Sequence, residues 1–161
     1  MKHLRLWVTL GILGFLAAAG LVALPHALSG GDQWFGGGSY LITLKDLEGN
    51  FGSRQVITLH ADQTMSVVDS GQDGPTYFYS SELGAWKPAG NGRIVARTID
   101  FDYPPNPDVA RLDYIINFVP DRNHVTGTIT ISTFPLETGN PLDGGGTVIL
   151  NYTFAGEWIK P

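Results

Sequence analysis

The chain from Arg93 to Phe134 reads RIVARTIDFDYPPNPDVARLDYIINFVPDRNHVTGTITISTF. It holds three runs rich in Val, Ile, Thr and aromatic residues, which favour β-strands, at Arg93–Tyr103, Ala110–Val119 and His124–Phe134. The breaks between them contain Pro, Asp and Asn, residues that favour turns. The stretch therefore predicts three consecutive antiparallel strands joined by short connections.

The same alternation extends outward in both directions from this stretch. Further strands are expected at Tyr40–Lys45, Arg54–His60, Thr64–Asp69, Thr76–Ser81, Leu83–Pro88 and Thr147–Ile159. Eight or nine strands with short, sequential connections predict an all-β fold, a single antiparallel up-and-down β-barrel of about eight strands. A β-sandwich needs a similar number of strands and is the alternative.

The N-terminal 29 residues have the pattern of an export signal. Lys2 and Arg5 precede an uncharged stretch from Leu6 to Leu24, and small residues follow at Ala27–Ser29. This pattern predicts a signal peptide or a membrane-anchor helix at 1–29, since about 20 apolar residues can span a bilayer. A Gly-rich tether at 30–38 and a barrel domain at 39–161 follow. In either case the barrel is expected to be exported: secreted, periplasmic or on the outer face of the membrane.

Composition limits the partners of the expected exported part. The residues after position 29 carry 8 Lys and Arg against 15 Asp and Glu, a formal net charge of −7. This balance argues against nucleic acid as a partner, and it leaves the N-terminal segment as the only membrane contact, if that segment is uncleaved. The chain has no cysteine, so its stability is expected to come from a hydrophobic core rather than from disulfides.

A short motif lies before the long strands. Gly84-Ala85-Trp86 is followed by a glycine turn at Gly90 and by the strand Arg93–Tyr103. This pattern resembles that of uncharacterised calycin-like, lipocalin-shaped small bacterial β-barrel proteins. The resemblance implies a barrel with an apolar interior, two inward hydrophobic residues on that strand (Ile99 and Phe101), and a small ligand inside.

The candidate ligand site follows from that choice of inner face. Arg97 would share the face of Ile99 and Phe101, and its guanidinium could anchor a ligand carboxylate. The remaining wall of the cavity is expected to come from aromatic residues of other strands. These candidates are Tyr114, Phe118, Tyr152 and Phe154, with Tyr77 and Tyr79 as further polar-tipped wall residues.

Three polar residues on neighbouring strands are the candidates for catalysis. Asp100, Asp113 and Tyr103 could serve acid–base chemistry if they lay in a pocket. With Ile99 and Phe101 inward, however, Asp100 would point to solvent. No metal site or cofactor is expected, since His60 and His124 both lie at turns and the glycine clusters lack a phosphate-loop pattern.

Three functions remain open from the sequence. The first is an exported barrel that binds a small apolar or amphipathic molecule in its interior. The second is a cyclase, isomerase or hydratase that works on a small molecule in the barrel lumen with Asp and Tyr. The third is a structural or interaction module of the cell envelope without a ligand. The sequence leaves the oligomeric state open.

Overall fold

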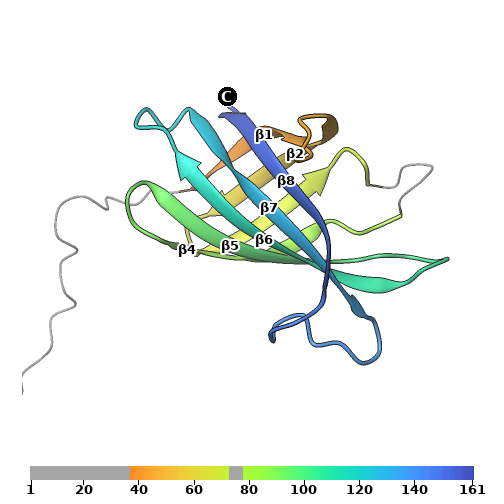
Figure 1. The fold of residues 1–161 in the computed structure, drawn as a ribbon. Helices are drawn as coiled ribbons and strands as arrows, with labels where there is room; N and C mark the ends of the chain where they lie inside the picture. The colour runs from red at the N-terminus through yellow and green to blue at the C-terminus, as the bar shows by residue number, and fades with distance from the viewer. Residues whose placement is uncertain (1–36, 73–77) are drawn as a thin grey trace, which may run out of the picture.

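The computed structural model describes residues 37–72 and 78–161, which form a closed barrel of eight antiparallel strands in chain order (Figure 1). The strands are β1 (Gly37–Lys45), β2 (Phe51–His60), β3 (Thr64–Asp69), β4 (Glu82–Pro88), β5 (Arg93–Phe101), β6 (Asp108–Phe118), β7 (His124–Pro135) and β8 (Thr147–Trp158). The predicted up-and-down barrel is confirmed, and the sandwich alternative is wrong because β8 pairs back onto β1.

The N-terminal predictions lie mostly outside this region. The signal or anchor segment 1–29 and the tether up to residue 36 belong to the part that is not described. The last two tether residues, Gly37 and Gly38, are instead paired with β2 at the start of β1. Within the two described ranges, no helix has the length and apolar character needed to cross a membrane.

The strand expected at Thr76–Ser81 is the main error in the predicted strands. Thr76 and Tyr77 lie outside the described residues, and Phe78–Ser81 contributes a single bridge between Tyr79 and Asp102. The backbone N–H of Ser80 donates to the carbonyl of Phe101, and the hydroxyl of Ser80 accepts a hydrogen bond from the N–H of Phe101. These residues therefore run beside the end of β5 without forming a full strand of the barrel.

The two ends of the barrel differ. The closed end carries the short turns 61–63, 89–92 and 119–123, and large side chains fill the interior there. Trp86 donates from Nε1 to the carbonyl of His60 at 3.2 Å, and the Tyr40 hydroxyl donates to the carbonyl of Arg122 at 3.2 Å. The Phe118 ring packs edge-on against Tyr40 with centroids 5.8 Å apart.

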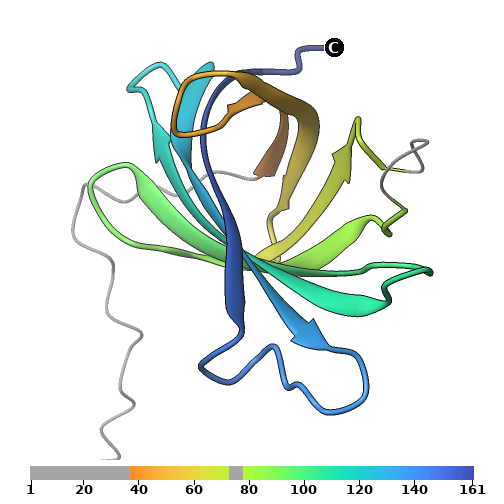
Figure 2. The same cartoon turned by 45° about the vertical axis from the view of Figure 1, so that its right-hand side comes forward.

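The open end carries the β1–β2, β3–β4, β5–β6 and β7–β8 connections. Figure 2 turns this end toward the viewer, and the β5–β6 and β7–β8 connections extend away from the wall. β1 pairs with β8 only between Tyr40–Lys45 and Thr153–Trp158, so the first half of β8 runs past the end of β1 toward this opening.

The hydrophobic core fills the barrel from the closed end and extends to Leu44, Ala110 and Leu112, which lie nearer the open end. Side chains of alternating residues point inward, as the pleat of a strand requires. The buried residues of this core are Tyr40, Ile42, Leu44, Ile57, Leu59, Met65, Val67, Trp86, Ile94, Ala96, Ala110, Leu112, Tyr114, Ile116, Val125, Ile129 and Phe154.

Gly84 explains why the Gly-Ala-Trp motif needs a glycine. It faces inward on β4 between Glu82 and Trp86, and a Cβ there would overlap the carbonyl oxygen of Arg97 and lie 2.7 Å from Cα of Thr98. Backbone atoms cannot move aside as a flexible side chain can. The close approach of β5 to β4 therefore depends on this residue.

We predict that Gly84→Ala lowers the free energy of unfolding by about 2 kcal/mol or more, since it forces a methyl group against the β5 backbone. Urea denaturation of the variant and the parent chain measures the difference. Gly144→Ala is the matched control, because nothing lies within 4 Å of a Cβ at that position. It should change stability by less than about 0.5 kcal/mol. Equal effects of the two variants would contradict the prediction.

Candidate functional site

A cavity of about 330 Å³ lies inside the barrel at the open end. Its apolar wall comes from β1, β6, β7 and β8, with Leu44, Leu112, Ile131, Leu150 and Tyr152 among its residues. Its polar wall comes from β2 to β5 and the segments that follow β3 and β5. These polar residues are Ser53, Gln55, Asp69, Tyr79, Glu82, Asp100 and Asp102.

Glu82 is the most buried carboxyl group of the cavity, with 2% of its surface exposed. Its Oε2 accepts hydrogen bonds from Thr98 Oγ1 and from the Tyr114 hydroxyl, both at 2.6 Å. Its Oε1 accepts one from Gln55 Nε2 at 3.2 Å. Burial raises the pKa of Glu82 to about 7, although the bonds from Thr98 and Tyr114 favour the ionised form and act in the opposite direction.

Asp100 lies on the next strand and faces the same cavity. Only 5% of its surface is exposed, and its Oδ1 has no hydrogen-bond partner among the described residues. Burial is the main cause that raises its pKa to about 8, and the charges of Glu82, Asp102 and Asp108 add to it. Asp100 is therefore a buried carboxyl group with an unused oxygen.

Two further carboxyl groups complete the polar wall, and both have partners. Asp69 accepts hydrogen bonds from Ser53 Oγ at 2.7 Å and from the backbone N–H of Gly71 at 2.6 Å. Asp102 is half-buried, and burial together with its hydrogen bond to Asp108 raises its pKa to about 7. Burial also raises the pKa of Tyr79, next to Asp69, so this hydroxyl stays protonated at neutral pH.

The predicted inner face of β5 is wrong. Ile94, Ala96, Thr98 and Asp100 face the interior, so Arg97, Ile99 and Phe101 lie on the outer face of the barrel. Phe101 is 49% exposed. Both faces of β5 carry apolar residues, and a shift of one residue exchanges them. Hydrophobicity therefore could not choose between the two faces.

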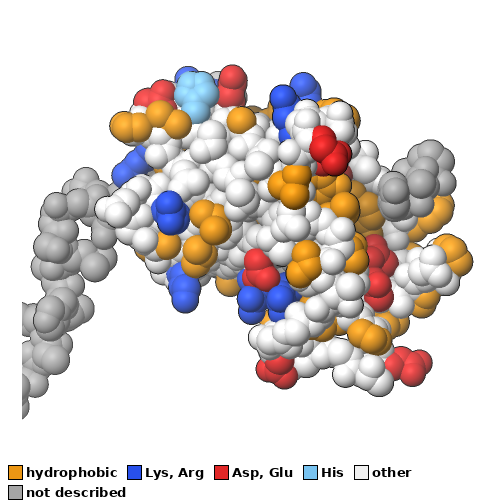
Figure 3. Space-filling view, viewed as in Figure 1, with side chains coloured by type: hydrophobic (Ala, Val, Ile, Leu, Met, Phe, Trp, Pro, Cys, Tyr) orange, Lys and Arg blue, Asp and Glu red, His pale blue; other side chains and the backbone are white. Residues whose placement is uncertain are grey.

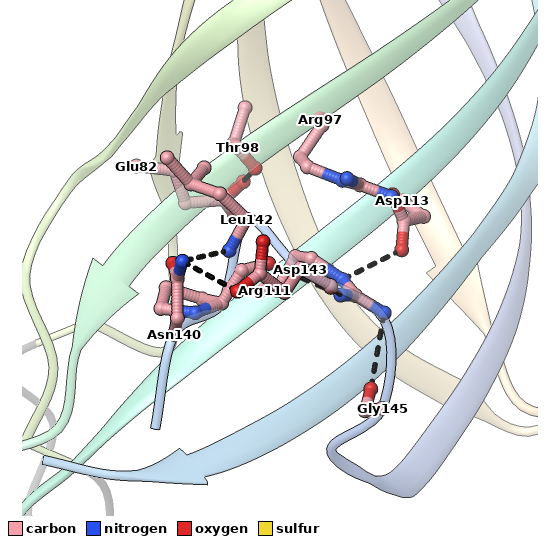
Figure 4. A network of polar contacts seen from close by, with 10 residues as sticks. Glu82, Arg97, Thr98, Arg111, Asp113, Asn140, Leu142, Asp143 and Gly145 are labelled. Atoms are coloured by element: carbon pink, nitrogen blue, oxygen red, sulfur yellow. Dashed lines mark hydrogen bonds and ion pairs between the residues drawn. The ribbon is translucent and has the colours of Figure 1, made fainter. Parts of the chain in front are cut away.

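Arg97 has a structural partner on that outer face. Its Nε lies 2.7 Å from Oδ1 of Asp113, and Nε of Arg111 lies 2.9 Å from Oδ2 of the same carboxylate (Figure 4). Arg111 also donates to the carbonyls of Pro141, at 3.1 Å, and Asp143, at 2.9 Å, in the β7–β8 connection. This network holds the connection against β6, away from the cavity.

The other predicted residues divide between the cavity, the core and the surface. Tyr152 and Tyr79 line the cavity, while Tyr114 reaches its floor through the bond to Glu82. Phe154 is buried in the core and Phe118 packs near the closed end. Tyr103 is 49% exposed and is not among the cavity residues. The predicted catalytic residues Asp100, Asp113 and Tyr103 are therefore not brought together.

A larger depression, of about 530 Å³, involves the outer face of β4 to β7. Its charged side chains are Lys87, Arg97 and Asp113, and the last two are paired with each other. The inner cavity differs because one of its lining residues, Asp100, has a buried carboxyl oxygen without a partner among the described residues. We therefore treat the inner cavity as the candidate site.

The cavity can offer hydrogen-bond acceptors and weak acids to a molecule that enters it. Asp100, Glu82 and Asp102 exchange protons near neutral pH, and Leu112, Ile131 and Tyr152 offer apolar contact. Across residues 37–72 and 78–161, no group of three or more His, Cys, Asp or Glu residues is arranged to hold a metal ion.

Glu82, Gln55 and Asp69 were missed as site residues, although the alternation carries a signal for them. Glu82 lies four residues before Trp86 and therefore shares its face, and Gln55 shares the face of Ile57 and Leu59. A polar residue in register with the strongest hydrophobic residues of a strand points into the barrel. Which of these polar residues meet across the lumen depends on the closure of the sheet.

The raised pKa values predict the pH dependence of stability. In an unfolded chain Glu82 and Asp100 titrate near pH 4, so between about pH 4 and pH 8 the folded protein binds more protons than the unfolded chain. The free energy of unfolding should therefore fall as the pH rises through this range. Asp100→Asn should flatten this slope and raise stability by about 2 kcal/mol at pH 9, with little effect at pH 5.

Chemical denaturation of both proteins at pH 5, 7 and 9 measures the effect. Glu157→Gln, which removes an exposed carboxyl group on β8, is the control and should leave the slope unchanged. No measurement is made below pH 5, where Asp46, Asp62 and Asp121 would add their own pH dependence, because hydrogen bonds lower the pKa of these exposed groups in the folded protein. A slope that is the same in Asp100→Asn and the parent chain would contradict the prediction.

Comparisons of the chain with protein-family models, with curated proteins and with solved structures find no match. The resemblance to calycin-like barrel proteins therefore stays a prediction. The features of this chain that bear on its function are the cavity and the side chains that line it.

Proposed function

We propose that this protein is an exported β-barrel that binds a small amphipathic molecule in the cavity at its open end. The observation that carries the proposal is the unequal filling of the barrel. Large side chains fill the closed half, whereas a cavity of about 330 Å³ remains in the other half. That volume is within the range of small-molecule sites, about 300 to 1,000 Å³.

The chemistry of the walls supports an amphipathic rather than a purely apolar molecule. One side of the cavity is lined by Leu44, Leu112, Ile131 and Leu150, and the opposite side by carboxyl and amide groups. A molecule with an apolar body and one polar group could satisfy both sides at once. Sites for small molecules commonly combine apolar walls with a few polar groups that fix orientation.

The rim of the opening supports the entry of such a molecule from this end. Five large apolar side chains lie in or beside the connections of the open end and are 47–75% exposed: Leu47, Phe51, Phe78, Leu142 and Ile149. In Figure 3 hydrophobic and acidic side chains gather toward the right-hand end, and the visible Lys and Arg side chains lie nearer the middle and the left. An apolar rim gives an amphipathic molecule a first contact before it enters the cavity.

The geometry gives less support to the two other functions. Catalysis by Asp100, Asp113 and Tyr103 would need all three near one substrate, and only Asp100 faces the cavity. An envelope module without a ligand needs no cavity, and a barrel of eight strands can be filled entirely by side chains.

The proposal predicts that a neutral aromatic dye enters the cavity. The fluorescence of N-phenyl-1-naphthylamine should rise when it is mixed with the full chain. Ala110→Phe should weaken this binding roughly tenfold or more, because Ala110 faces inward on the cavity wall and a phenyl ring would occupy its space. Titration of the dye at pH 7 gives both dissociation constants.

Ala155→Phe is the matched control, since Ala155 is exposed on the outer face of β8. It should bind the dye like the parent chain, and the apolar N-terminal segment is common to all three proteins. Cooperative thermal unfolding checks that each variant is folded. Unchanged affinity in Ala110→Phe would show that the dye binds elsewhere and would remove the support for this site.

A further inference from the structure

The carboxyl groups of the cavity come from several strands and converge on one wall. Asp69 ends β3, Glu82 begins β4, Asp100 lies near the end of β5, and Asp102 follows β5. The described residues that line the cavity include no Lys, Arg or His. A molecule in the cavity therefore meets acidic groups without a basic side chain to balance them.

Asp100 is the group in this wall whose hydrogen bonding is incomplete. Glu82 accepts three hydrogen bonds and Asp69 accepts two. In contrast, Oδ1 of Asp100 has no partner in the described part of the chain, although the side chain is 95% buried. A buried polar group left without a partner destabilises the folded protein, and it does so more strongly when it is charged. A donor from a bound molecule would remove that destabilisation.

We propose that the molecule that fills the cavity is an amphipathic amine whose protonated nitrogen donates to the carboxylate of Asp100. This inference rests on the function proposed above and names the chemical class of the ligand. The ammonium group would lie between Asp100 and the other carboxyl groups. The apolar part of the amine would lie against Leu112, Ile131 and Tyr152 on the opposite wall.

The alternatives fit the wall less well. A carboxylate or phosphate ligand would bring a negative charge among Asp69, Glu82, Asp100 and Asp102 with no basic partner in the lining. A neutral alcohol could donate one hydrogen bond, but it would not balance the charge of an ionised Asp100. A protonated amine supplies both a donor and a positive charge, and hydrogen bonds between charged groups are the stronger ones.

The pH dependence of binding follows from the groups around Asp100. Besides Asp100, five titratable groups line the cavity: Asp69 from β3, Tyr79 from the segment before β4, Glu82 from β4, Asp102 from the segment after β5 and Tyr152 from β8. Two more titratable groups contact these residues. Tyr114 from β6 contacts Glu82, and Asp108 contacts Asp102. Burial keeps Asp100 and Glu82 partly protonated near pH 7. An amine must displace those protons, so its affinity should increase from pH 6 to pH 9, until the amine itself begins to lose its proton.

The test compares three ligands of similar shape on the full chain. Tryptamine is a cation, tryptophol replaces its ammonium group with a hydroxyl, and indole-3-acetate is an anion. At pH 8.5, calorimetric titration should show tryptamine binding roughly tenfold or more tighter than tryptophol, with indole-3-acetate the weakest. The advantage of tryptamine over tryptophol should shrink at pH 6.

Asp100→Asn should lower the affinity for tryptamine to roughly that for tryptophol and leave tryptophol within about twofold of the parent chain. Glu157→Gln removes an exposed carboxyl group on the outer face of β8 and is the control for a general loss of negative charge. It should bind tryptamine as the parent chain does. An equal loss in both variants would overturn the inference, because it would assign the effect to the net charge.

The test also separates failure of this inference from failure of the proposed function. If tryptophol binds as tightly as tryptamine, or if the neutral dye binds and tryptamine does not, the inference that the ligand is an amine is wrong. The proposal that a small molecule binds in the cavity then still holds. If the dye and all three indoles fail to bind the parent chain, both proposals are overturned. A tryptamine advantage that is lost in Asp100→Asn and kept in Glu157→Gln supports both.

Discussion

The pairing of β1 with β8 closes the sheet, and this closure determines which side chains face the interior of the barrel. The pairing joins Tyr40–Lys45 to Thr153–Trp158, strands more than 100 residues apart in the sequence. Once the sheet is closed, every strand has one face inside and one face outside. The alternation of side chains then becomes a division between a lumen and an outer surface.

The limited length of that pairing also shapes the cavity. β8 has 12 residues and β1 has 9, and they pair only over the second half of β8. The first half of β8 continues past β1 and carries Leu150 and Tyr152 to the cavity wall. Tyr152 lies over Gly52 of β2, where a Cβ would come within 2.9 Å of its ring. The unequal lengths of β1 and β8, together with the connections, therefore determine the shape of the open end.

The polar wall is unusual for a protein interior, where carboxyl groups are rarely buried. Gln55, Glu82 and Tyr114 satisfy one another by hydrogen bonds, so this part of the wall is a complete network. Asp100 lies next to the network, but one of its oxygens has no partner within residues 37–72 and 78–161. Buried groups of this kind reduce stability, and they are concentrated at functional sites in many proteins. The position of Asp100 on a cavity wall, rather than in the packed core, is what links it to binding.

The class of fold, the order of the strands and the approximate bounds of the eight strands could be predicted from the sequence, because period-two alternation and turn residues are local signals. The sequence also placed Tyr114 and Phe154 in the interior, where each alternates with polar or exposed neighbours. It could not choose the inner face of β5, because Ile94 and Ala96 on one face compete with Ile99 and Phe101 on the other. The inner face of β5 was decided by its pairing within the closed sheet. The register between β5 and β6 pairs Asp100 with Ala110 on the inside, and Arg97 with Asp113 on the outside, where Arg111 and the β7–β8 connection join them. Such pairings between strands depend on the whole closed sheet, and no single strand encodes them.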